Sequence, residues 1–116
     1  MTTKAIIKLS LATVVLAAFL SATARADEAS VIWTKTCAAC HGKDGKGQTK
    51  MGRKVDVKDY TDPKVQAEIK DDEATKTIKE GIKDDKGKER MKAYGDQYTD
   101  DEIKSLIAYL RAFKPQ

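Results

Sequence analysis

Five consecutive residues, Cys37-Ala38-Ala39-Cys40-His41, contain both cysteines and the only histidine of the 116-residue chain. Cysteines three positions apart on one helical turn point to the same side of the helix. Their thiols can each add to a different vinyl group of one porphyrin, and the adjacent histidine then directs a ring nitrogen at the iron. The C-x-x-C-H spacing therefore predicts one covalently attached haem c, with His41 as an axial ligand of the haem iron.

Three other uses of these side chains fit the sequence less well. A structural zinc site needs four ligands, and two cysteines and one histidine supply only three. A thioredoxin-like redox pair needs a βαβ context, whereas the flanking residues suggest a helix followed by a glycine-rich loop. A structural disulfide is the ordinary outcome in an oxidising compartment, but it gives no reason for the only histidine to follow Cys40 directly.

The second axial ligand decides what such a haem does. A strong ligand on the other face gives an electron carrier, whereas an open face gives gas binding or peroxidase chemistry. Apart from Met1, the candidates are Met51 and Met91, and both are expected in charged loops. Ten residues from His41 to Met51 could span about 33 Å if extended, so chain reach does not choose between the two methionines. Filling a gap in the core is the ordinary alternative role for each.

The attachment motif is expected at the end of the first helix. Apolar residues recur at three- and four-residue steps from Glu28 to Cys40, which predicts an amphipathic helix with both thiols on its inner stripe. The stripe consists of Ala29, Ile32, Trp33, Cys37 and Cys40. The glycines from Gly42 to Gly47 then predict a loop whose backbone can approach a flat cofactor closely.

Two short helices are expected in the middle of the chain. Asp62 and Pro63 predict an N-cap followed by the first helical residue, with Val65 and Ile69 facing inward. A second helix is expected to begin at Asp71 or Asp72 and to end near Gly81. Its inner face would consist of Ala74, Ile78 and Ile82.

The last helix has the clearest signal. Thr99 and Glu102 predict a capping box, and Pro115 marks the far limit of the helix. The inner face would consist of Ile103, Leu106, Ile107 and Leu110. Because no alternating strand pattern, internal repeat or second domain is visible, the sequence predicts an all-α chain.

Residues 1–26 have the layout of a secretory signal peptide. Lys4 and Lys8 precede the apolar run from Leu9 to Leu20, and Ala24-Arg25-Ala26 is an A-x-A cleavage site. A spanning helix needs about 20 apolar residues, so this run is too short for a membrane anchor. We therefore expect cleavage after Ala26, export to the periplasm and a single domain at residues 27–116. A domain of that size has a marginal apolar core, so a bulky buried cofactor is expected to complete it.

Charge is unevenly distributed along the expected mature chain. Without Lys4, Lys8 and Arg25, 19 basic residues stand against 18 acidic ones, a net charge of +1, which predicts no nucleic-acid partner. Residues 43–58 carry six basic and two acidic residues, and residues 83–92 carry five and three. Because both segments are expected to border the haem, the sequence predicts redox partner proteins with acidic docking patches.

Residues 27–116 resemble a class I c-type cytochrome in motif position, helix order and length. In that family the first and last helices cross through a small residue and aromatics, and Ala29, Trp33 and Tyr109 occupy those places. Bundle-type cytochromes carry the motif near the carboxyl terminus and fit poorly. The resemblance implies a cytochrome c fold, with three to five short helices around one covalently bound haem.

The resemblance also favours Met91 over Met51 as the second axial ligand, because the family places its methionine in the loop before the last helix. Two departures from the family pattern stand out. Lys92 follows the methionine where the family often has proline, and no proline lies between His41 and Tyr60. Another backbone carbonyl is therefore expected to orient the His41 ring.

With both axial positions filled, the resemblance implies a monomeric periplasmic carrier of single electrons that is not an enzyme. The alternative is a haem enzyme or gas sensor with an open or weakly ligated sixth position. A thiol–disulfide oxidoreductase is the second alternative, and it would contain no haem.

Overall fold

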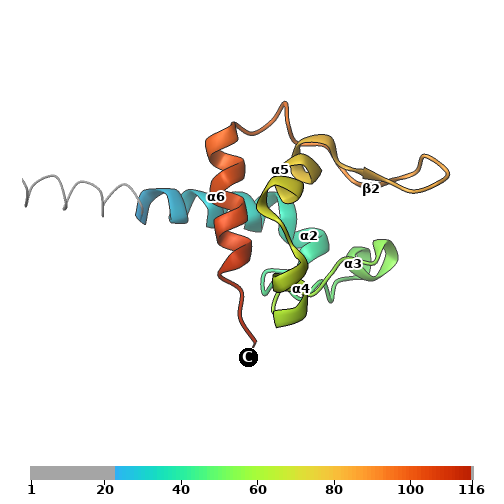
Figure 1. The fold of residues 1–116 in the computed structure, drawn as a ribbon, viewed down its shortest axis with the longest axis horizontal. Coiled ribbons are helices and arrows are strands. Elements are labelled where there is room, and N and C mark those ends of the chain that lie inside the picture. The colour runs from blue at the N-terminus through green and yellow to red at the C-terminus, as the bar shows by residue number, and fades with distance from the viewer. Residues whose placement is uncertain (1–22, 116) are drawn as a thin grey trace, which may run out of the picture.

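The computed structural model describes residues 23–115, which are mostly helical with one short hairpin (Figure 1). The all-α class expected from the sequence is confirmed. After a helical stretch at residues 23–32, the elements are η1 (Trp33–Cys37), α2 (Ala38–His41), α3 (Lys50–Val55), α4 (Pro63–Glu68), α5 (Asp71–Glu80), β1 (Ile82–Lys83), β2 (Glu89–Met91) and α6 (Asp100–Arg111).

The predicted signal peptide lies mostly outside the described residues. Its charged start and apolar run are not described, and the three residues of its cleavage site are exposed at the beginning of the helical stretch. Cleavage after Ala26 therefore stays a prediction. Within residues 23–115, no helix is both long and apolar enough to cross a membrane.

The first helix runs without a break from residue 23 to His41, but its winding changes just before the attachment motif. Residues 33–37 form a π-helical turn, in which the Ala38 N–H donates to the Trp33 carbonyl, five residues back. Regular three- and four-residue spacing predicts a uniform α-helix and does not reveal this wider turn. Such π-turns are rare and occur frequently at functional sites.

The core forms where α6 crosses the first helix, as the family resemblance implies (Figure 1). Ala29 is only 1% exposed, so the two helices approach closely at this small residue. The Trp33 ring lies 5.5 Å from that of Tyr109 on α6, measured between centroids. Around these residues, Ile32, Leu106 and Leu110 complete the buried cluster.

The capping box at the start of α6 is confirmed. The Thr99 hydroxyl accepts the Glu102 N–H at 3.2 Å, and the Glu102 carboxylate accepts the Thr99 N–H at 2.7 Å. These two bonds satisfy backbone donors that have no partner inside the helix. The four apolar residues predicted for the inner face are all buried: Ile103, Leu106, Ile107 and Leu110.

The middle helices also begin where the sequence predicts. The Asp62 carboxylate accepts the Lys64 N–H at 2.8 Å, and Pro63 is the first residue of α4. α5 begins at Asp71 and ends at Glu80, and the next residue, Gly81, has a φ of +73° that suits glycine. The prediction that Ile82 lies on the inner face of this helix is wrong. Because Gly81 ends the helix, Ile82 falls in β1, where it is 44% exposed.

The hairpin was not expected from the sequence. β1 and β2 pair antiparallel, with Ile82 opposite Met91, and the hairpin projects away from the helices (Figure 1). The Asp84 carboxylate holds the turn by accepting the N–H groups of Lys86 and Lys88, each at 2.9 Å. Strands of two and three residues are too short to show an alternating pattern in the sequence.

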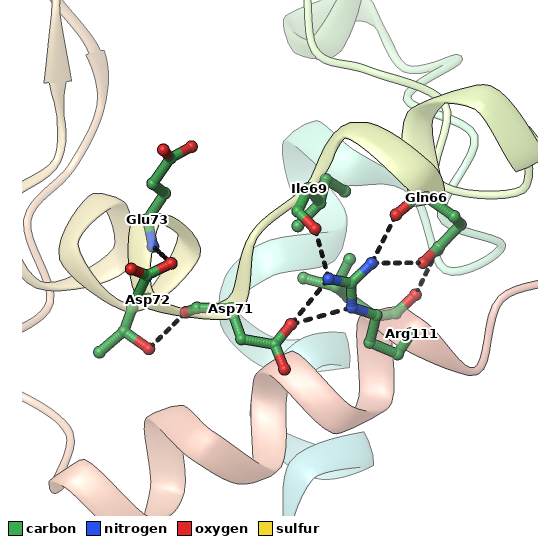
Figure 2. Close-up of polar contacts among 8 residues, drawn as sticks. Gln66, Ile69, Asp71, Asp72, Glu73 and Arg111 are labelled. Carbon is green, nitrogen blue, oxygen red and sulfur yellow. Dashed lines mark hydrogen bonds and ion pairs between the residues drawn. The ribbon is translucent and has the colours of Figure 1, made fainter.

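α6 is fixed to the α4–α5 connection by Arg111 (Figure 2). Its guanidinium donates to the carbonyls of Gln66, at 2.6 Å, and of Ile69, and it forms an ion pair with Asp71 at 2.8 Å. The Gln66 side chain in turn donates to the carbonyls of Leu110 at 2.9 Å and Tyr60 at 2.7 Å. This network connects the last helix with the middle of the chain.

Candidate haem-binding site

An apolar cavity lies between the first helix, Tyr60, α5, the end of β2 and α6. Of the residues predicted to hold haem, Cys37, His41 and Met91 all line this cavity. Cys40 follows on α2 and is half-buried without being part of the lining. The other lining residues are almost all aromatic or aliphatic: Trp33, Tyr60, Ile78, Tyr94, Tyr98, Leu106 and Leu110.

The two thiols are half-buried and free, with no disulfide between them. Burial raises the pKa of Cys37 to about 11, and the neighbouring Cys40 adds to this effect. A reactive cysteine of the thioredoxin type has a lowered pKa, because its thiolate is the attacking species. The surroundings of Cys37 therefore do not favour the thiol–disulfide alternative.

The His41 ring is held between two aromatic side chains. It stacks on Tyr60 at a centroid distance of 5.3 Å, and it lies 5.6 Å from Trp33. Burial lowers the pKa of His41, which favours the neutral imidazole that binds metals. Its Nδ1 atom is buried and has no hydrogen-bond partner within the described part of the chain. The carbonyl expected to orient the ring is not found at Nδ1, and aromatic packing positions the ring here.

Backbone contacts fix the attachment turn. The buried Trp33 indole donates to the Gly42 carbonyl at 2.9 Å, and the Gly47 N–H donates to the His41 carbonyl at 2.8 Å. The Thr49 hydroxyl donates to the Cys40 carbonyl at 2.7 Å. These bonds hold the carboxyl end of the motif, while the Cys37 and His41 side chains line the cavity.

α3 lies beside the motif and was not expected from the sequence. Thr49 caps α3 by accepting the Gly52 N–H at 2.8 Å, so one hydroxyl connects α3 with the attachment turn. A Cβ atom at Gly52 would lie 2.4 Å from the Cys40 carbonyl oxygen, so only glycine allows this approach. Because α3 consists mostly of charged and small residues, it has no apolar stripe that would have revealed it.

The two candidate methionines have different surroundings. Met91 is the last residue of β2, is half-buried and lines the cavity together with His41. Gly81 allows the chain to pass close to it, since a Cβ there would lie 2.5 Å from the Met91 carbonyl oxygen. Met51 was expected in a loop, but it lies in α3, is 46% exposed and is not part of the cavity lining.

These residues fit a covalently attached haem. Thiol, imidazole and thioether groups line one apolar cavity, and burial favours the neutral imidazole, the form that binds iron. In the same residues, no group of three or more histidine, cysteine, aspartate or glutamate side chains is placed to hold a separate metal ion. The donor set therefore suits haem iron better than zinc.

Comparison with known proteins agrees with this geometry. Residues 24–110 match the family described as cytochrome C oxidase, cbb3-type, subunit III. The chain belongs to this cytochrome c family. Solved structures similar to this cytochrome include the KustC0563 c-type cytochrome, with 27% identity and a TM-score of 0.64 over 74% of this chain and 96% of that one.

A tyrosine-to-phenylalanine mutant of Kustc0563 is also similar, with 26% identity and a TM-score of 0.64 over 75% of this chain and 99% of that one. No curated protein matches the chain. The family and the two structures show a small monohaem class I c-type cytochrome, as the sequence resemblance implied. Membership of this family implies haem c binding and haem-based electron transfer.

Proposed function

We propose that this cytochrome carries single electrons in the periplasm on one haem c. The haem is attached through Cys37 and Cys40 and is ligated by His41 and Met91. The observation that carries the proposal is that Cys37, His41 and Met91 line one apolar cavity, whereas Met51 lies outside it. When bound, the haem supplies the Fe(III)/Fe(II) couple.

The residues around the cavity suit electron transfer rather than catalysis. If His41 and Met91 both held the haem iron, no coordination position would be free for oxygen or peroxide. A thioether ligand favours the ferrous state relative to a second histidine, so the reduction potential is expected to be comparatively high. The apolar lining limits the access of water to the cavity. This exclusion of water should also raise the reduction potential.

Visible spectroscopy on two matched variants tests the ligand set. In protein isolated from the periplasm, with Asp27 as its first residue, the ferric wild type should show the weak near-infrared band of methionine-ligated haem. Met91→Ala should abolish this band and Met51→Ala should leave it intact. Covalent haem without the band in the wild type would favour the open-site alternative, and a colourless protein would contradict haem attachment.

We also propose that the partners are redox proteins with acidic docking patches. The two basic segments of the sequence come together in the fold, because the Arg90 guanidinium on β2 donates to the Val55 carbonyl at the end of α3. Lys50 and Lys54 on α3 and Lys83 on β1 are all exposed. Exposed basic groups on adjoining elements would attract an acidic surface towards the side of the molecule on which Met91 lies.

A further inference from the structure

The loop from Met91 to Tyr98 connects β2 with α6 and carries the proposed thioether ligand. Two backbone hydrogen bonds anchor its middle to α5, from the N–H groups of Tyr94 at 2.8 Å and Gly95 at 3.1 Å. The residue directly after the methionine is Lys92, which is exposed and does not restrict the backbone as a proline would. The position of Met91 therefore depends on its pairing with Ile82 in the hairpin and on contacts that the loop makes further along.

One such contact joins the loop to the haem-attachment helix. The hydroxyls of Tyr98 and Thr36 lie 2.6 Å apart in a partly buried position. Thr36 belongs to the π-helical turn and directly precedes Cys37. Within the described residues, this is the one hydrogen bond between residues 91–98 and residues 33–41. It connects the segment that carries Met91 with the segment that carries the two cysteines.

The Gln97 side chain supports the hydrogen bond between Tyr98 and Thr36. The Gln97 side chain donates to the Tyr98 hydroxyl oxygen at 3.1 Å, so this oxygen can accept from Gln97 while its own proton is donated to Thr36. Hydrogen bonds in such a chain polarise and strengthen one another. Tyr98 also lines the cavity, together with Met91 and Cys37.

We propose that Tyr98 is a positioning residue for Met91, acting through its hydrogen bond to Thr36. The bond holds the loop against the attachment helix and so keeps the Met91 thioether on the haem side of the loop. It takes over part of the restraint that a proline after the methionine would provide. This inference rests on the proposed His41 and Met91 ligation.

Three variants test the role of the hydroxyl bond in the holoprotein. Tyr98→Phe and Thr36→Val each remove one hydroxyl and keep the shape of the side chain. Tyr109→Phe is the matched control, since Tyr109 is also half-buried but makes no side-chain hydrogen bond within residues 23–115. The readouts are the near-infrared band, the affinity of the ferric protein for added imidazole and the urea midpoint.

Imidazole competes with Met91 for iron, so its apparent affinity rises with the fraction of molecules in which the methionine is detached. Tyr98→Phe and Thr36→Val should each tighten imidazole binding by about fivefold, the factor expected from one net hydrogen bond. The double variant should bind no more tightly than either single one, because both remove the same bond. Tyr109→Phe should bind imidazole like the wild type.

Unchanged imidazole affinity in Tyr98→Phe and Thr36→Val, with the wild-type band present, would overturn the positioning role alone. If Tyr109→Phe tightened imidazole binding equally, the positioning role would be overturned too, because the loss of any tyrosine hydroxyl would then produce the same change. If the wild type lacked the band, the ligation itself would be wrong and the inference would fail with it. If Tyr98→Phe did not fold, Thr36→Val alone would decide.

Discussion

Gly52 determines how closely α3 can approach the haem-attachment turn. It has an ordinary helical backbone, so its role is not conformational freedom but the absence of a side chain. An added Cβ would lie 2.4 Å from the Cys40 carbonyl oxygen and 2.5 Å from that of Gly47. Gly87, at the hairpin turn, is the opposite case, with a φ of +78° and no heavy atom within 4 Å of an added Cβ.

Alanine at these two glycines should therefore destabilise the protein for different reasons. Gly52→Ala forces backbone against backbone and should lower the free energy of unfolding by about 1–3 kcal/mol, as other overpacked sites do. It should also reduce the yield of covalently attached haem, because the attachment turn has to move. Gly87→Ala should cost about 1 kcal/mol from the left-handed backbone alone and leave haem attachment unchanged.

Urea denaturation and the haem content of purified protein measure both effects. In an open helix, alanine is more stable than glycine by about 1 kcal/mol. A stabilised Gly52→Ala variant would therefore show that α3 does not pack on the attachment turn.

Among the elements, α6 holds the fold together through its buried face and its carboxyl end. Its buried face packs on the first helix, and Arg111 at its end connects it with the turn between α4 and α5. Two of the four groups that Arg111 contacts are backbone carbonyls, which only a planar guanidinium can reach together with a carboxylate. The ion pair with Asp71 is the weaker part, because that carboxylate is 67% exposed.

Substitutions of Arg111 and Asp71 should separate these contributions. Arg111→Lys keeps the charge but loses the fork of donors, and we expect a loss of about 1–2 kcal/mol in the free energy of unfolding. Asp71→Asn removes only the exposed ion pair and should cost less than about 1 kcal/mol. Urea denaturation at low and high salt measures both, and only the Asp71 effect should shrink with salt. Equal losses in the two variants would show that the ion pair provides the stability of the network.

Elements with a strong local signal were predictable, and those fixed by tertiary contacts were not. The capping box at Thr99 and the proline at the start of α4 carry their own signals, and the structure confirms both. The hairpin was missed for another reason, because its strands of two and three residues are too short to show an alternating pattern. α3 depends on Gly52 lying close to the Cys40 carbonyl, a contact between two separate elements. Contacts of this kind leave no periodic pattern in the sequence.

The candidate site was predictable to a similar extent. Cys37, Cys40 and His41 are adjacent in the chain, so their spacing alone indicates their chemistry. The cavity-lining tyrosines were missed, because Tyr60 and the pair Tyr94 and Tyr98 come from two segments that only the fold brings together. The bond between Thr36 and Tyr98 was missed for the same reason, since the two residues are 62 positions apart in the chain.

For the molecule as a whole, the elements that project from one side also carry exposed basic residues. α3 and the hairpin project from the side opposite the amino-terminal part of the first helix (Figure 1), and Arg90 connects them. Their exposed basic residues surround the strand that ends at Met91. A small anionic oxidant should therefore react at this side of the protein faster than a cationic oxidant with the same redox driving force.

Two inorganic oxidants of opposite charge test this asymmetry without a natural partner. At low ionic strength, hexacyanoferrate(III) should oxidise the ferrous protein faster than tris(phenanthroline)cobalt(III) does after correction for driving force, and added salt should reduce the difference. Lys50→Glu with Lys54→Glu should slow the anionic oxidant by about threefold to tenfold and accelerate the cationic one. The matched control is Lys104→Glu with Lys114→Glu, which changes net charge equally at exposed positions on and after α6. If both double variants slow the anion equally, net charge rather than the α3 surface governs its approach, and acidic partners would have no reason to dock beside Met91.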